Sequence, residues 1–431
     1  MWQKPKNHAK LIDLLDKKLT NSDFILKNKN SPSDFTRKRN FTFKSLSLFI
    51  ISSIQSSIQR ELDRFFKSYN HKELSEKFAS QSAFSQARLK IKPDAFRELD
   101  DDCIAHFYKN YQIKKWNGFR LIAIDGSEII VPKTEETIDE FGEYTTNFMN
   151  KTVVLARVSK AYDALNKISI DAKLVNRKIG EHTLANQHLE FCGKGDLVLY
   201  DRGYPSFDLF RNTLASGSHF CARVAVSNWN VAKRLVESGE KEIITEIKPG
   251  NDLQMKYKKQ AINVEPIKCK FICIKLPSGE KEVLITSLLD QEKYPYDIFK
   301  KLYHLRWSVE ESYKKDKHRL QLENFSGKSI IAIYQDFYAN ILMGNLTSIL
   351  SSGLEDEIDK KTKYKYQINI TTAIAKVKET IALLFTRSNI TELIEKLIQI
   401  FLSNILPIRP NRSFERKKEK RKRYYKCYLT L

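Results

Sequence analysis

Four polar residues at fixed spacing carry the strongest chemical signal in this chain: Tyr303, Arg306, Glu310 and Lys317. Residues three, four and seven apart share one face of a helix, so a helix over 303–317 would align all four in one polar stripe. A carboxylate in such a stripe can bind a metal ion, and the phenol, guanidinium and ammonium groups can bind phosphate oxygens. The stripe therefore predicts chemistry on a phosphodiester.

Two upstream aspartates are candidate partners for Glu310. Asp125 and Asp201 each follow four apolar residues, where strands are expected to end. An aspartate after a buried strand is costly unless it binds a metal or pairs with a cation. Each residue alone also has a structural explanation: Asp125 begins an Asp-Gly pair typical of turns, and Asp201 can pair with the arginine that follows it.

Together the three acids predict a metal site. Three close carboxylates repel one another and are stable chiefly when divalent cations neutralise them. The expected ion is Mg²⁺, with Mn²⁺ able to substitute, because all the donors are oxygens. Two such ions could activate an attacking water or 3′-hydroxyl and stabilise the leaving oxygen.

The elements that must position these acids follow a recognisable order. Alternating and apolar runs predict three strands, a helix, a strand, a helix and a strand, over 120–131, 153–158, 168–175, 181–191, 196–201, 206–215 and 219–226. The first three strands can form an antiparallel meander, to which crossover helices add two parallel strands. That is a ribonuclease-H-like α/β core. Its first and fourth strands are neighbours, which would place Asp125 beside Asp201, and a helix over 296–320 would supply Glu310.

Five regions are predicted along the chain. They are a helical N-terminal DNA-binding region (1–115), the first part of the core (116–226), a β-rich insertion (227–290), the acid-bearing and following helices of the core (291–354), and a helical C-terminal region with a basic tail (355–431). In the N-terminal region, two short helices flank the turn at 92–94, and Ser82 is the expected cap of the first. With Gln86, Arg88, Lys90 and Lys92 exposed, this hairpin could contact a DNA groove or simply present a solvated basic face.

Composition favours a polyanionic partner. Lys and Arg number 74 against 52 Asp and Glu, a formal net charge of +22 over 431 residues. A membrane partner is disfavoured, because the apolar stretch 330–350 contains Gln335, Asp336, Asn340 and Asn345 and is predicted to be a buried helix. The charged N-terminus lacks the apolar region of a signal peptide, so an intracellular protein is expected.

These residues resemble a known family. Tyr303, Arg306, Glu310 and Lys317 match the Y-x₂-R-x₃-E-x₆-K signature of bacterial DDE transposases of insertion-sequence family four. The chain is similar to that family also in its first acidic block, its second acidic block and its N-terminal block, at 124–127, 200–204 and 82–88. The insertion lies where the family has one. The resemblance covers most of the chain and is weakest over 1–40 and 355–405.

The resemblance implies a role for each matching residue. Asp125, Asp201 and Glu310 would bind the metal ions and be catalytic. Tyr303, Arg306 and Lys317 would hold phosphates near the 5′ end of the transposon. Two further DNA contacts are expected. Trp307 could stack on a flipped base, with core packing as the alternative, and Arg223 could reach a phosphate, with a structural ion pair as the alternative.

The activity that the resemblance implies is cut-and-paste transposition. The enzyme would cleave double-stranded DNA at terminal inverted repeats and join the 3′-hydroxyls to target DNA, as a homodimer in a synaptic complex. Its expected location is the bacterial cytoplasm, in association with the nucleoid and without membrane attachment. The alternatives are a catalytically inactive or domesticated sequence-specific DNA-binding protein, and a stand-alone ribonuclease-H-like DNA nuclease.

Overall fold

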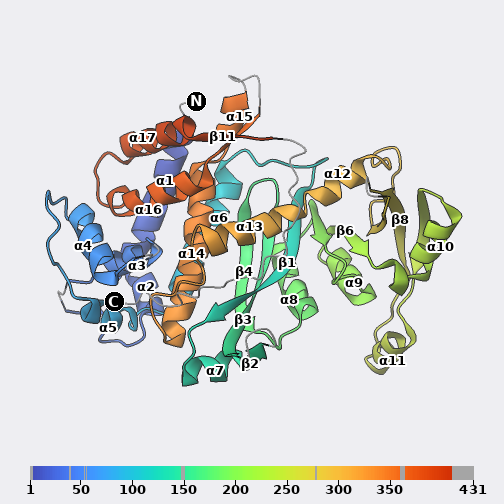
Figure 1. Cartoon of the computed structure of the whole chain (residues 1–431), viewed down its shortest axis with the longest axis horizontal. Helices are drawn as coiled ribbons and strands as arrows, with labels where there is room; N and C mark the ends of the chain where they lie inside the picture. Colours follow the sequence, from blue (N-terminus) through green and yellow to red (C-terminus); the bar gives the residue numbers. More distant parts are fainter. Residues whose placement is uncertain are drawn as a thin grey trace. The chain divides into compact units, whose positions relative to one another are not determined.

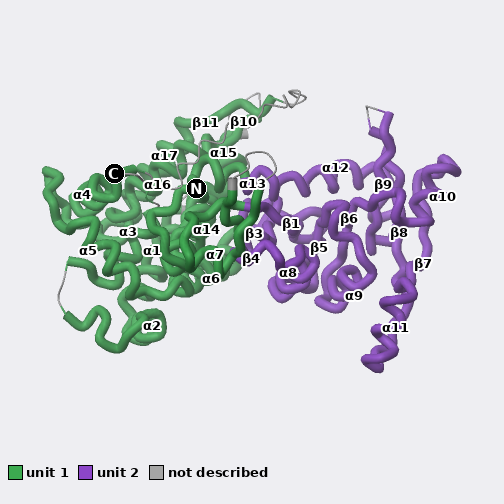
Figure 2. Tube along the Cα trace, turned by 60° about the horizontal axis from the view of Figure 1, so that its bottom comes forward, with its two compact units in different colours: residues 1–112, 129–156, 314–431 green, residues 113–128, 157–313 purple. Residues whose placement is uncertain are grey.

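The computed structural model describes residues 3–37, 40–52, 54, 56–146, 151–276, 279–359 and 365–409. The chain divides into two compact units (Figure 2): unit 1 comprises Met1–Gln112, Ile129–Ala156 and Lys314–Leu431, and unit 2 comprises Ile113–Glu128 and Arg157–Tyr313. The basic tail predicted beyond Arg409 lies outside the described residues. The boundaries of the five predicted regions stay predictions.

Among the described residues, nine strands form one mixed sheet with the order β2-β3-β1-β5-β6-β9-β8-β7, and β4 also pairs with β3. The strands are β1 (Arg120–Val131), β2 (Glu143–Thr146), β3 (Lys151–Asp163), β4 (Ile168–Asn176), β5 (Asp196–Tyr200), β6 (His219–Val224), β7 (Glu242–Ile247), β8 (Ile267–Lys275) and β9 (Lys281–Thr286). Strand β5 is parallel to both of its neighbours, β1 and β6. The predicted α/β, ribonuclease-H-like order is confirmed, including the adjacency of its first and fourth strands.

The predicted insertion extends the core sheet. Strand β9 pairs antiparallel with β6, β8 with β9, and β7 with β8. Two helices belong to the same segment, α10 (Asn230–Ser238) and α11 (Asn251–Lys259), and α10 packs against β8 (Figure 1). The sequence pattern indicates three strands here, as observed. It does not indicate that they join the sheet that carries the acids.

Two helices connect strands of unit 2: α8 (Glu181–His188) lies between β4 and β5 in the sequence, and α9 (Phe207–Ala215) connects the parallel strands β5 and β6. Helix α9 begins after Ser206, whose hydroxyl oxygen accepts a hydrogen bond from the backbone N–H of Leu209 at 3.3 Å. The helix packs on β6, where the rings of Phe210 and Phe220 stack with centroids 4.1 Å apart. Apolar contacts of this kind hold the crossover helices against the sheet.

The acid-bearing segment corrects one prediction. It forms two helices, α12 (Ile298–His304) and α13 (Trp307–His318), instead of one over 296–320. Between them the backbone N–H groups of Leu305, Arg306, Ser308 and Val309 bond to carbonyls three residues earlier, not four. This tightened turn changes the helical period, so the prediction of one continuous helix is wrong, although Tyr303 and Arg306 still contact candidate acids, Asp201 and Glu310. Tyr303 lies on α12, Arg306 in the turn, and Glu310 with Lys317 on α13.

Unit 1 is mainly helical. Its helices are α1 (Gln3–Thr20), α2 (Ser22–Asn28), α3 (Phe43–Ile51), α4 (Ile58–Tyr69), α5 (Gln81–Arg88), α6 (Asp94–Asn110), α7 (Glu135–Phe141), α14 (Ile330–Leu350), α15 (Leu354–Asp359), α16 (Ile370–Leu384) and α17 (Ile390–Ser403). Two short strands, β10 (Tyr366–Ile368) and β11 (Ile405–Pro407), pair antiparallel.

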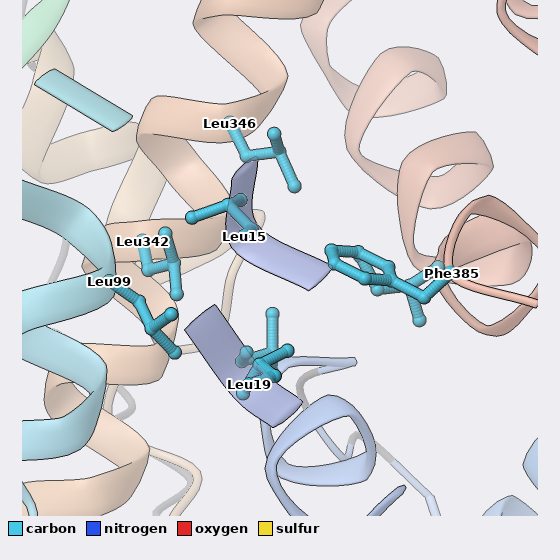
Figure 3. A pocket seen from close by; sticks show the side chains of 8 residues that line it. Leu15, Leu19, Leu99, Leu342, Leu346 and Phe385 are labelled. Atoms are coloured by element: carbon cyan, nitrogen blue, oxygen red, sulfur yellow. The ribbon is translucent and has the colours of Figure 1, made fainter. Parts of the chain in front are cut away.

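Helix α14 is the buried centre of unit 1. It packs against α3, α6 and α16, and Asn345 donates hydrogen bonds to both carboxylate oxygens of Asp100 on α6, at 2.9 and 3.0 Å. The prediction of a core helix here is confirmed, and no described helix is long and apolar enough to cross a membrane. A small pocket beside α14 belongs to the packed core, since every residue lining it is apolar (Figure 3): Leu15, Leu19, Ile51, Leu99, Leu342, Leu346, Ile381 and Phe385.

The N-terminal hairpin has the predicted turn but not the predicted surface. Helix α5 is capped by Ser80, not Ser82. Gln86 on α5 and Lys92 in the turn before α6 are exposed as predicted, whereas Lys90 is half-buried. Arg88, expected to be exposed, is buried. Its guanidinium donates to the side chains of Gln335, Ser326 and Asp336 at 3.0, 2.7 and 2.7 Å. A buried, fully paired guanidinium has a structural role within unit 1.

Candidate active site

The two candidate aspartates lie at the same level of the sheet in unit 2. Parallel pairing between β1 and β5 ends with Ile124 opposite Tyr200, and Asp125 and Asp201 are the next residues. Strand β1 continues beyond this point, so Asp125 does not end its strand as expected, although it does end the pairing with β5. Ligand and catalytic groups commonly lie at the carboxyl ends of parallel strands.

Arg306 links Asp125 to Glu310. Its Nη2 donates to Glu310 Oε1 at 2.6 Å, and its Nη1 lies 3.8 Å from Asp125 Oδ2. The arginine is only 3% exposed, because the turn between α12 and α13 directs it inward. Glu310, one helical turn later, stays partly exposed. One buried cation therefore contacts two of the three candidate acids.

Asp201 has a different set of partners. Its Oδ1 accepts from Arg223 Nη2 at 3.1 Å and from the Tyr303 hydroxyl at 3.2 Å. Arg223 also donates to Glu282 on β9 at 2.7 Å. The structural ion pair considered for Arg223 is thus present, and its contact with DNA stays a prediction. The structure brings Tyr303, Arg306 and Arg223 to the three acids.

Two buried side chains that the sequence did not single out hold α13 in place. The Tyr313 hydroxyl donates to the main-chain carbonyl of Asp125 at 2.8 Å. Lys160, fully buried on β3, donates from Nζ to Ser312 Oγ at 2.7 Å and lies 5.1 Å from the centre of the Tyr313 ring. Tyrosine and lysine at these positions carry no spacing signal that would have revealed the contacts.

The charges of the three acids act on one another. Burial raises the pKa of Asp125 to about 6; the N–H of Gly126 and the Arg306 guanidinium oppose this rise, and the charges of Glu310 and Asp201 add to it. Burial alone would also raise the pKa of Asp201. The N–H that follows it and the guanidinium groups of Arg306 and Arg223 outweigh burial and lower that pKa. The site holds two neighbouring aspartates with opposite pKa shifts.

The donor chemistry of Asp125, Asp201 and Glu310 fits a hard divalent cation, because all three side chains offer carboxylate oxygens. In the described part of the chain, however, no group of three or more His, Cys, Asp or Glu side chains is already arranged to hold a metal. In the same region Arg306 is paired with Glu310, and Arg223 is paired with Asp201. The predicted ligand set of Asp125, Asp201 and Glu310 stays a prediction.

The remaining predicted DNA contacts occupy different environments. Trp307 is 38% exposed, and its ring lies 5.5 Å from the Arg306 guanidinium. This exposure argues against core packing, which was the alternative role for Trp307. Lys317 is partly buried on α13, seven residues after Glu310, and belongs to unit 1. The roles of both residues stay predictions.

Residues at the start of α8 also approach the site, although no role in it was predicted for them from the sequence. A Cβ at Gly126 would lie 3.1 Å from Glu181 Oε1, so the carboxylate of Glu181 rests against the backbone after Asp125. Tyr204 is 2% exposed, and its hydroxyl has no hydrogen-bond partner among the described residues. Burial raises the pKa of this hydroxyl, and the negative charges of Asp125 and Glu181 raise it further. The ring of His182 bonds to the carbonyl of Gly203 at 3.1 Å. The position of Glu181 opening a helix was the only available signal.

The other end of α8 has a Ser-His-Asp arrangement that is structural. His188 Nε2 lies 2.9 Å from Ser159 Oγ, and its Nδ1 lies 2.7 Å from Asp171 Oδ2. Serine and histidine are both fully buried, so no macromolecular substrate reaches the hydroxyl. The network fixes the last turn of α8 on β3 and β4.

Comparisons with known proteins identify the family of this chain. Residues 116–346 match the family model described as the transposase DDE domain. This match spans more than half of the chain, which therefore belongs to the DDE transposase family. The chain is also 24% identical over 348 residues to the transposase InsG for insertion sequence element IS4 of Escherichia coli (strain K12), covering 79% of this chain and 76% of that protein.

A solved structure gives a looser likeness. The cryo-EM structure of the piggyBac transposase synaptic complex with hairpin DNA aligns with a TM-score of 0.47 and 13% identity. The alignment covers 95% of this chain and 88% of that chain.

Proposed function

We propose that this protein is a DNA transposase that cleaves DNA at the ends of an insertion sequence and joins those ends to target DNA. Membership of the DDE transposase family supports a phosphoryl-transfer enzyme. One observation carries the proposal furthest. Asp125 and Asp201 follow the last paired residues of neighbouring parallel strands, and Arg306 joins Glu310 to Asp125 in the same unit.

In the proposed reaction Asp125, Asp201 and Glu310 bind a divalent cation, Mg²⁺ or Mn²⁺. When bound, that ion would stabilise negative charge on the attacking and leaving oxygens of a phosphodiester. The protein's own groups position the substrate. Tyr303 and Arg306 can donate hydrogen bonds to phosphate oxygens, and the buried surroundings of Arg306 strengthen such a bond.

The partner proposed for the site is double-stranded DNA. A net charge of +22 favours a polyanion, and the exposed ring of Trp307 beside Arg306 offers a stacking surface for a base. Lys317 would add a phosphate contact. The specific substrates would be terminal inverted repeats and target DNA, joined by a homodimer in the bacterial cytoplasm in association with the nucleoid.

The decisive experiment compares Glu310→Gln with Glu311→Gln in cleavage and strand transfer on DNA that carries the ends of the element. Glu311 is the adjacent, exposed carboxylate on the same helix. Loss of Glu310 is expected to reduce cleavage by about a thousandfold or more, with binding to the ends retained. Loss of Glu311 should leave cleavage near the level of the unaltered protein. Full cleavage by Glu310→Gln in Mg²⁺ would remove this acid from the mechanism.

Two rival functions give different results in the same experiment. A stand-alone nuclease would hydrolyse the DNA without forming a joined product. An inactive DNA-binding relative would bind the ends without cleaving them, even when Mn²⁺ is supplied.

A further inference from the structure

Protein cations already compensate the three candidate metal ligands, but they do so unequally. Arg306 contacts Glu310 at 2.6 Å and Asp125 at 3.8 Å, and it is 3% exposed. Arg223 contacts Asp201 at 3.1 Å, is 26% exposed at its side chain and is also held by Glu282 at 2.7 Å. Arg223 therefore keeps a second carboxylate if Asp201 turns away, whereas the ion-pair partners of Arg306 among the described residues, Asp125 and Glu310, are both candidate metal ligands.

Arg306 also has unused hydrogen-bonding capacity. Within the described residues, its Nε and Nη1 have no hydrogen-bond partner, although both atoms are buried. Leaving donors of a buried guanidinium unpaired is costly, so this arrangement points to an additional acceptor. The rings of Tyr303 and Trp307 lie 5.8 and 5.5 Å from the guanidinium carbon, and both contacts involve the π face of a ring, which supplies no oxygen acceptor. A phosphate has the charge and the oxygens to satisfy the unpaired donors.

Glu310 cannot easily serve Arg306 and a divalent cation together. Its Oε1 already accepts a charge-assisted hydrogen bond at 2.6 Å. A cation bound to this carboxylate would lie close to the guanidinium, and two like charges in a poorly solvated site repel strongly. An anion that draws Arg306 toward itself would relieve the repulsion and free the carboxylate oxygen.

We infer that Arg306 couples the two ligands of this site: a DNA phosphate that engages Arg306 releases Glu310 to bind the divalent cation. The inference rests on the proposed function and concerns how the site is regulated. It means that the protein binds the cation weakly until DNA is present, so the hydrolytic centre is completed on its substrate. Linkage also requires the reverse effect, with the cation strengthening DNA binding by the same factor.

The test measures Mn²⁺ binding to the full chain by electron paramagnetic resonance, with and without a short random-sequence DNA duplex at constant ionic strength. In the unaltered protein the duplex should raise Mn²⁺ affinity about tenfold. The Mn²⁺ affinity of Arg306→Met without DNA should equal or exceed that of the unaltered protein with DNA. Adding the duplex to Arg306→Met should raise its Mn²⁺ affinity little further. Lys301→Gln, which removes an exposed charge on α12, should keep the tenfold effect.

Three results decide the matter. Equal Mn²⁺ affinity of the unaltered protein with and without the duplex overturns the coupling, as does an Arg306→Met variant that gains no Mn²⁺ affinity. If Arg306→Met does not fold, Arg306→Lys replaces it, and the duplex should then raise its Mn²⁺ affinity by less than tenfold.

The reciprocal measurement compares DNA affinity with and without Mn²⁺ and needs no variant. Mn²⁺ binding by Glu310→Gln equal to that of the unaltered protein would refute the ligand set of the proposed function instead, so the two failures are distinguishable.

Discussion

The hydroxyl of Tyr313 donates a hydrogen bond to the main-chain carbonyl of Asp125 at 2.8 Å, which fastens the helix bearing Glu310 to the strand bearing the first aspartate. The phenol is buried, and its ring also receives the Lys160 ammonium at 5.1 Å. Both acids are thus positioned by a residue that touches neither carboxylate.

Removing that hydroxyl should affect cleavage more than DNA binding. Tyr313→Phe is expected to lower the free energy of unfolding by about 1 kcal/mol, the usual net value of one hydrogen bond. The cleavage rate should fall about tenfold, because small displacements of reacting groups are costly. Single-turnover cleavage and end-binding assays check this, with Tyr366→Phe on β10 as the control. Unchanged cleavage by Tyr313→Phe would mean that the contact does not position the acids.

Substitution of Trp307 should weaken DNA binding without destabilising the fold, whereas substitution of Trp229 should destabilise the fold. Trp307 is exposed beside Arg306, so Trp307→Ala should change stability by less than about 0.5 kcal/mol. If a base stacks on the Trp307 ring, the same variant should bind transposon ends with a binding free energy less favourable by about 1–3 kcal/mol. Trp229 packs against Phe210 and Phe271, with ring centres 6.3 and 6.0 Å away, so Trp229→Ala should instead destabilise the fold. Chemical denaturation and end binding of both variants separate the two roles; equal affinity of Trp307→Ala and the unaltered protein contradicts stacking.

Arg88 should be essential for the stability of unit 1. Arg88→Met leaves Asp336 buried without its guanidinium partner, and loss of one member of a buried ion pair costs about 3–5 kcal/mol. Arg97→Ala, an exposed arginine on α6, should cost far less. Urea denaturation measures both. The double variant Arg88→Met with Asp336→Asn should recover part of the loss, and a strictly additive loss would argue against the pair.

Lys378 should make stability depend on pH. Burial lowers the pKa of this lysine to about 7 from an unfolded value of 10.5, with the charge of Glu61 opposing the shift. The folded state therefore binds fewer protons than the unfolded state between pH 7 and 10.5, and the lysine's contribution to stability rises with pH across that window. Lys378→Met should stabilise the protein most below pH 7, and the gain should vanish near pH 10.5.

Thermal unfolding across that pH range measures the effect. Lys376→Met, two residues earlier on α16, is the matched control because the Lys376 ammonium is paired with Glu379 at 2.8 Å at the surface. A gain from Lys378→Met that is the same at every pH would show that burial of the charge is not its cause.

Local patterns were sufficient to predict the part of the sheet that carries the two aspartates. The apolar run around Asp125 has the bounds of β1, and the alternation of strands and helices yields the order in which β1 and β5 become neighbours. These features depend on residues close together in the sequence. The break between α12 and α13 could not be predicted in this way, because the polar spacing runs through Arg306 without interruption and only the backbone hydrogen bonds reveal the tighter turn.

Contacts between distant residues were the main source of error. Arg88 looked like a surface residue because its partners Ser326, Gln335 and Asp336 lie more than two hundred positions away. Lys160 and Tyr313 gave no signal for the same reason, since a lysine in a strand and a tyrosine in a helix are ordinary until the fold brings them together.

The joining of the inserted strands to the core sheet has a structural consequence. Strand β9 pairs with β6. Glu282 on β9 forms an ion pair with Arg223, which forms a second ion pair with Asp201. The strand that carries Asp201, β5, is thus linked to β9 both by strand pairing through β6 and by the two ion pairs of Arg223. The inserted strands therefore supply, through Glu282, one of the contacts that hold the arginine beside Asp201.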